Sequence, residues 1–154
     1  MTTRSPRPGE KDGVDYHFVT RKYFREMIKK RGFLEYEENF GHLYGTPKKF
    51  IENNFKKGKP VLLSIDVKGA MKVRRQYPEE SVLIFILPPS LKALEERLRL
   101  RKSEGRQAIS TRLRLAKKEM SYKKKYDYIV VNDRLDAAYK KLKNIVVSEL
   151  SEGV

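Results

Sequence analysis

Three short apolar runs separated by helical patterns constrain the fold of this 154-residue chain more than any other feature. They occupy residues 61–65, 81–87 and 128–131. Continuous apolar runs of this kind are typical of parallel strands that are covered on both faces and joined by helices. Helical patterns follow the runs, over about 70–76, 90–101, 107–122 and 135–150. The chain is therefore predicted to have a doubly wound α/β core with right-handed crossovers.

The residues before this core show smaller elements. Alternation predicts strands at 15–19 and 33–37, with a turn at 39–41. Between the two strands, Thr20 is suited to cap a helix over about 22–30. Thr46 is suited to cap another that has Pro47 at its first position and ends at Gly58. We expect these elements to form a small α+β flap.

Composition excludes several classes of protein. Hydrophobic residues make up 39% and charged residues 36%, which is an ordinary globular balance. With no Cys and two separate histidines, a disulfide framework, a thiolate metal site and a histidine metal site are not expected. No apolar run approaches a membrane span, and the first residues do not resemble a signal peptide. We expect a cytoplasmic protein that has no membrane partner.

A net charge of +15 favours anionic ligands of some kind. The lysines fall in separate short groups, which suit solubility or a phosphorylated ligand as well as a nucleic-acid groove. Nucleic-acid binding therefore rests on the charge alone, and it would predict affinity that falls steeply with salt.

A candidate phosphate site lies at the start of the chain. Arg4 and Arg7 flank Pro6 and precede Pro8, and the two prolines disfavour a helix here. Two guanidinium groups on an extended backbone can hold the oxygens of one phosphate. The alternative is a solvated basic terminus.

Other polar residues occupy suggestive places, and each has a simpler explanation. Asp66 follows one predicted strand and Asn132-Asp133 follow another, at the edge where open α/β sheets bind ligands. The simpler explanation for Asp66 is that it caps the next helix. Glu35 lies between Leu34 and Tyr36 and could be an exposed strand residue. Tyr44 could be core packing, and three arginines could be helix-surface charges: Arg97, Arg101 and Arg112.

Taken together, these motifs resemble one family. The segments TTRSPRPGE, DYHFV, FLEYEENFGHLYGT, VLLSIDVKGA, FILPPS, LEERLRLR and YDYIVVND occur in an order and spacing similar to those of guanylate kinase, from Thr2 to about Leu150. The resemblance implies an α/β fold with a P-loop-kinase-type parallel sheet core, a GMP-binding flap and a helical lid. The implied boundaries are residues 4–58 for the flap, 59–100 and 126–154 for the core, and 101–125 for the lid.

The resemblance also implies roles for ten residues. The GMP phosphate would be held by Arg4, Arg7, Tyr16 and Tyr44. The guanine base would be bound by Glu35, Thr46 and Asp66. The phosphates being transferred would be contacted by Arg97, Arg101 and Arg112. ATP would be the phosphoryl donor and Mg²⁺ the cofactor.

This assignment fits the chemistry. Guanine presents two adjacent N–H donors that one ionised carboxylate can accept, and adenine does not, so a buried carboxylate would discriminate strongly between them. Phosphoryl transfer needs chiefly in-line positioning and positive charge, which arginines and Mg²⁺ supply.

The sequence departs from the family in two ways. It has no G-x-x-x-x-G-K-[ST] phosphate loop, because its one Gly-Lys pair, Gly58-Lys59, is followed by Pro60 and has Asn53 where the first glycine should be. Ser64 stands where the family usually has a carboxylate, which leaves open how Mg²⁺ is held.

Two hypotheses follow from the missing loop. Either the chain is an N-terminally incomplete guanylate kinase that lacks the first core strands, inactive by itself in converting GMP to GDP, or it is a module that only binds GMP or a phosphorylated peptide. The oligomeric state is not predicted.

Overall fold

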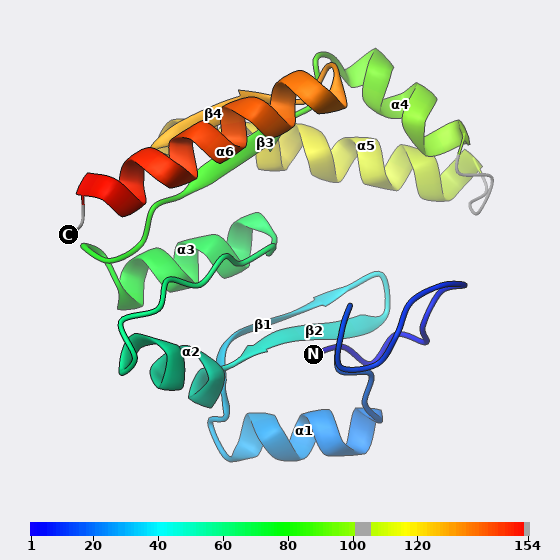
Figure 1. Ribbon diagram of the computed structural model, residues 1–154. Helices are drawn as coiled ribbons and strands as arrows, with labels where there is room; N and C mark the ends of the chain where they lie inside the picture. Colours follow the sequence, from blue (N-terminus) through cyan, green and yellow to red (C-terminus); the bar gives the residue numbers. More distant parts are fainter. Residues whose placement is uncertain (101–105, 153–154) are drawn as a thin grey trace. The chain divides into compact units, whose positions relative to one another are not determined.

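The computed structural model of the chain describes residues 1–100 and 106–152, which fall into two units that divide after Glu79 (Figure 1). The first unit contains α1 (Arg21–Lys29), β1 (Phe33–Asn39), β2 (His42–Pro47), α2 (Lys48–Phe55) and α3 (Val67–Gln76). The second contains β3 (Ile84–Leu87), α4 (Leu91–Leu100), α5 (Arg106–Met120), the 3₁₀ helix η1 (Ser121–Lys125), β4 (Tyr128–Val131) and α6 (Leu135–Glu152). Every helix predicted from the sequence is present, with ends shifted by a few residues.

An antiparallel hairpin of β1 and β2 is the centre of the first unit (Figure 1). Its turn uses left-handed backbone at Phe40 (φ 51°) and Gly41 (φ 80°), as tight hairpin turns require. The N-terminal residues extend the hairpin, because Met1 and Thr3 donate backbone hydrogen bonds to β2. Arg4 therefore directly follows the residues that pair with β2.

Helices cover the hairpin through two apolar groups. Phe24 of α1 is fully buried, and its ring stacks on Phe33 with centroids 4.3 Å apart. The other group joins β1, α2 and α3 through the buried side chains of Leu34, Ile51 and Val73. Both groups hold β1 in place, and β1 carries the candidate residue Glu35.

The strand predicted at residues 61–65 is not present, and that prediction is wrong. Val61, Leu63 and Ile65 pack against the apolar group around Leu34, whereas Leu62 is 76% exposed. The side chains thus alternate as in a strand, but no described residue forms a ladder with this backbone. An apolar pattern predicts which side chains are buried, and it becomes a strand only when a neighbour accepts and donates its hydrogen bonds.

The continuous strand predicted at residues 15–19 is also wrong. Tyr16 and Phe18 form only isolated bridges, to Asp12 and Thr2. The side chain of Asp12 accepts the backbone N–H of Phe18 at 2.8 Å, so a side chain satisfies this amide in place of a strand partner.

In the second unit, β3 and β4 pair in parallel, as the apolar runs predicted, with Phe85 opposite Ile129 and Leu87 opposite Val131. Phe85, Leu87 and Val130 are buried. Helix α6 lies along β4, and α4 contacts α5 (Figure 1). The strand predicted from Ser81 begins only at Ile84.

Candidate functional site

Thr2 anchors the segment that carries the candidate phosphate residues. Its side chain is fully buried, and its hydroxyl donates to the backbone oxygen of Leu43 at 3.0 Å. The same hydroxyl accepts the N–H of Arg4 at 3.2 Å. The backbone at Arg4 is thereby tied to β2 through one buried side chain.

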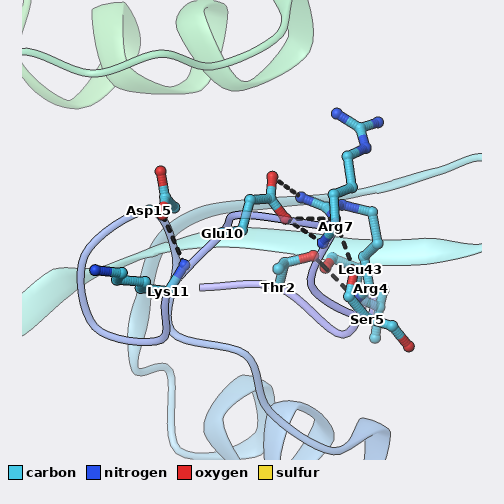
Figure 2. A network of polar contacts seen from close by, with 8 residues as sticks. All are labelled: Thr2, Arg4, Ser5, Arg7, Glu10, Lys11, Asp15 and Leu43. Carbon is cyan, nitrogen blue, oxygen red and sulfur yellow. Dashed lines mark hydrogen bonds and ion pairs between the residues drawn. The ribbon is translucent and has the colours of Figure 1, made fainter.

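Arg4 is held by a carboxylate that sequence reasoning did not single out. Its Nη1 and Nη2 atoms each donate to Glu10 at 2.9 Å, to Oε2 and Oε1 respectively, and Nη1 also donates to the Ser5 carbonyl at 2.7 Å (Figure 2). Glu10 also accepts the N–H of Arg7 at 2.7 Å. The pKa of Glu10 is lowered, first by its hydrogen bond to Arg4. The segment is therefore an ordered loop, and the alternative of a frayed basic terminus is wrong.

Aromatic side chains surround the Arg4 guanidinium. Its central carbon lies 5.5 Å from the ring centroid of Tyr16 and 5.7 Å from that of Phe18, within cation–π range. The Tyr44 ring lies 6.3 Å from that of Tyr16. The pKa of Arg4 is raised, first by the Glu10 hydrogen bond and further by Tyr44. The structure thus brings Arg4, Tyr16 and Tyr44 together.

Arg7 differs from Arg4. Its side chain is exposed and extends away from the Arg4–Glu10 pair (Figure 2). Within residues 1–100 and 106–152, its guanidinium has no hydrogen-bond acceptor. Its charge is available to an anion that binds beside Arg4.

A second polar group is built on β1, β2 and the start of α3. Glu35 is only 6% exposed, and the Thr46 hydroxyl donates to its Oε1 at 2.7 Å. Its other oxygen, Oε2, receives no hydrogen bond from the described residues. Burial is the main cause that raises the Glu35 pKa, and the nearby charge of Asp66 adds to it, while the Thr46 hydrogen bond opposes it. The exposed-strand interpretation of Glu35 is wrong.

Thr46 does not cap α2 as expected. Pro47 occupies the cap position without a side-chain hydrogen bond. The Thr46 hydroxyl is already donated to the buried carboxylate of Glu35, where an unpaired oxygen would cost more than an uncapped amide at the surface. The Thr46 hydroxyl thus contacts Glu35 and does not cap α2.

Asp66 lies close to Glu35 because both approach Gly69. A Cβ atom on Gly69 would lie 2.8 Å from Glu35 Oε2 and 3.4 Å from Asp66 Oδ1. Asp66 Oδ1 accepts the N–H of Gly69 at 2.8 Å, so Asp66 does cap α3. Its Oδ2 accepts the side-chain amide of Asn39 at 2.7 Å. Capping and a place in the candidate site are therefore compatible for this residue.

The three candidate arginines of the transfer step follow Glu79 in the sequence and so fall in the range of the second unit. Arg97 of α4 donates to the backbone oxygens of Asn132 at 2.8 Å and Asp133 at 3.0 Å, which follow β4. Arg112 of α5 is half-buried. Arg101 lies outside the described residues.

Sequence reasoning missed three members of the site, namely Glu10, Asn39 and Gly69. Glu10 belongs to the same short motif as Arg4 and Arg7. Its position three residues after Arg7 could have indicated a carboxylate partner for the arginines. Nothing in the sequence pairs Asn39 with Asp66, because 27 positions separate them.

Some features are absent from the part of the chain that the structure describes. No cluster of three or more His, Cys, Asp or Glu side chains there could hold a metal ion. None of the described helices has the length and apolarity that crossing a membrane requires.

The described elements, helices with one antiparallel and one parallel strand pair, define an α/β protein. The chain superimposes with a TM-score of 0.82 on the crystal structure of guanylate kinase from Anaplasma phagocytophilum, at 38% identity, over 96% of this chain and 72% of that one. The profile of the family described as Guanylate kinase matches residues 1–149. The chain belongs to the guanylate kinase family.

Curated relatives agree with this assignment. The guanylate kinase of Caldanaerobacter subterraneus is 43% identical over 148 residues, which are 96% of this chain and 71% of the relative. That of Nitrosospira multiformis is 48% identical over 96% of this chain and 70% of the relative. That of Thermus thermophilus is 48% identical over 97% of this chain and 67% of the relative.

Proposed function

We propose that this chain binds GMP for phosphorylation to GDP by ATP in the cytoplasm, and that the GMP site lies within the first unit. One observation supports this most strongly. Glu35 is a buried carboxylate with one oxygen that lacks a donor among the described residues, and it belongs to the same unit as the Arg4, Tyr16 and Tyr44 cluster. A nucleoside monophosphate with N–H donors on its base offers the two kinds of group that these features accept.

The GMP phosphate would be bound by two arginines with different functions. Arg4 is already oriented by Glu10, so it presents its remaining N–H donors at little further ordering cost. Arg7 would supply the uncompensated charge. Tyr16 and Tyr44 would donate their hydroxyls to phosphate oxygens, which accept several donors at once.

The guanine base would be selected by Glu35. Its Oε2 and Oε1 would accept the N–H of N1 and one N–H of the exocyclic amine, with the Thr46 hydroxyl holding the carboxylate in orientation. Adenine would leave this buried carboxylate without donors, which disfavours AMP. Asp66 lies beside Glu35, where it can accept a further N–H of the base.

Transfer would use Arg97, Arg101 and Arg112 to stabilise the charge on the phosphates. The Arg97 guanidinium now donates to two backbone oxygens, so a phosphate contact requires exchange of at least one of these bonds. In this proposal residues 4–58 form the flap, residues 59–100 and 126–154 the core, and residues 101–125 the lid.

The residues described do not form a protein cage for Mg²⁺. This fits a metal ion held mainly by ATP phosphates and water, as is usual for Mg²⁺ in kinases. Bound in that way, Mg²⁺ would neutralise charge on the transferred group.

Phosphoryl transfer also needs a structure that holds the ATP phosphates, and the 154 residues contain no G-x-x-x-x-G-K-[ST] loop. We propose that these residues alone bind GMP and do not form GDP, because holding two reactants together supplies ~7–11 kcal/mol that would be lost. The experiment measures GMP binding by calorimetry and GDP formation in the presence of ATP and Mg²⁺.

A chain extended upstream in the gene's reading frame, if that frame encodes a glycine-rich loop, should bind GMP and form GDP. GDP formation at kinase rates by residues 1–154 alone would overturn the proposed need for the loop. GMP binding without GDP formation by the extended chain would favour the second candidate, a non-catalytic module that binds GMP or a phosphorylated peptide.

A further inference from the structure

Asn39 lies at the end of β1 and contacts the second carboxylate of the candidate site. Its side-chain amide donates to Asp66 Oδ2 at 2.7 Å, while the N–H of Gly69 donates to Oδ1 at 2.8 Å. Each oxygen of Asp66 therefore has one donor, and the two donors come from different elements, β1 and α3. We propose that Asn39 is a positioning residue that orients Asp66 toward the exocyclic amine of guanine, an inference that rests on the proposed GMP site.

Asp66 needs such a donor because of its neighbour. The Glu35 and Asp66 carboxylates both approach Gly69. They are close enough to each other that the charge of Asp66 contributes to the raised pKa of Glu35. Two adjacent carboxylates repel each other, and an Asp side chain that caps a helix through one oxygen can still rotate the other. The Asn39 amide donates a short hydrogen bond to the charged Oδ2 atom of Asp66. This bond opposes both the repulsion by Glu35 and the rotation of the Asp66 carboxylate.

The chemistry of guanine gives this orientation a purpose. The edge of the base carries three N–H groups, one on N1 and two on the exocyclic amine. Glu35 has two oxygens, and these suit the N1 proton and the adjacent amine proton. The second amine proton is left for an acceptor beside Glu35, and Asp66 is the carboxylate in that place.

IMP is the probe that separates positioning from simple structural support. It carries the same ribose and phosphate as GMP and lacks the exocyclic amine. If Asn39 acts through Asp66 on that amine, its loss weakens GMP binding and leaves IMP binding nearly unchanged. If Asn39 only fastens the hairpin to α3, its loss weakens both ligands alike.

The experiment measures GMP and IMP affinities by calorimetry for the wild-type chain, Asn39→Ala and Asn39→Asp. Asn39→Ala should lower GMP affinity about fivefold, as expected for one oriented hydrogen bond, and change IMP affinity less than about twofold. Asn39→Asp keeps the size and turn preference of Asn, and it replaces the donor with an acceptor, so its GMP loss should be larger. It carries the test if Asn39→Ala does not fold.

Asn54→Ala is the matched control. The Asn54 amide donates to the Phe50 backbone oxygen within α2, away from both carboxylates, so neither affinity should change. A fall in the GMP-to-IMP affinity ratio confined to the Asn39 variants supports the proposal.

Equal loss for both ligands, or no loss for either, overturns the role of Asn39 and leaves the GMP site standing. Absence of saturable GMP binding by the folded wild-type chain overturns the proposed function, and this inference with it.

Discussion

Replacing Glu35 by Gln is the most direct test of base selection, because it changes one atom of a buried group. The glutamine side chain would keep one oxygen and present an amide N–H to a guanine N–H. The site would lose one charged hydrogen bond and gain a donor–donor clash, worth together about 3 kcal/mol. GMP affinity should fall by a factor on the order of 10², and AMP affinity should change little, so selectivity should collapse.

The same substitution should not destabilise the fold at neutral pH. Burial raises the pKa of Glu35 above its ordinary value of 4.5. Since the unfolded chain keeps the ordinary value, the folded state loses stability as pH rises from about 4.5 through the raised pKa. Glutamine does not ionise, so the variant should be at least as stable as the wild type at pH 7, and the difference should shrink on acidification.

The assay combines calorimetric titration with GMP and AMP and thermal melting from about pH 4, just below the ordinary pKa of 4.5, up to about pH 7. Glu38→Gln on the same strand is the control, since Glu38 forms an exposed ion pair with Arg21 and should leave selectivity intact. An unchanged GMP-to-AMP ratio for Glu35→Gln would refute the assignment of Glu35 to the base. A large fall in melting temperature at neutral pH would refute the reasoning on burial.

Two further predictions concern the hydrogen bonds around these groups. Thr46→Val removes the donor that opposes the rise in the Glu35 pKa, so GMP affinity, followed by calorimetry across pH, should begin to fall at a higher pH on acidification than in the wild type; superimposable pH profiles would contradict this. Arg4→Ala and Arg7→Ala should each reduce GMP affinity by about 1.5–3 kcal/mol. Of these two variants only Arg4→Ala should lower the melting temperature, because of the two side chains only that of Arg4 has a carboxylate partner among the described residues. Arg21→Ala, which removes an exposed ion pair with Glu38, is the control and should leave GMP affinity unchanged. Full GMP affinity in both variants would remove the phosphate assignment.

Much of the fold could be predicted from local patterns. The Thr20 cap, the hairpin turn at Phe40-Gly41 and the parallel strand at Tyr128–Val131 are present as predicted, because each depends on residues adjacent in sequence or on one apolar run. The error at residues 61–65 has the opposite cause. Whether that run becomes a strand depends on a neighbouring backbone, and no pattern within the run contains that information.

The candidate site shows the same division. The buried Glu35 and the cluster of Arg4, Tyr16 and Tyr44 agree with residues selected from the sequence, although their ligands remain proposals. The partner of Asp66 could not have been found from the sequence, because the Asn39 contact exists only after β1 and α3 pack together.

Gly69 constrains how this protein can vary. It lies in the first turn of α3, where its backbone does not need left-handed freedom and alanine would favour the helix by up to about 1 kcal/mol. Yet a methyl group there would come within 2.8 Å of the Glu35 carboxylate. Selection for stability alone would tend to replace this glycine, and selection for a buried carboxylate beside it would retain it. A larger residue at position 69 should therefore be tolerated only when position 35 changes as well, so a survey of substitutions at position 69 would be misleading unless position 35 were varied with it.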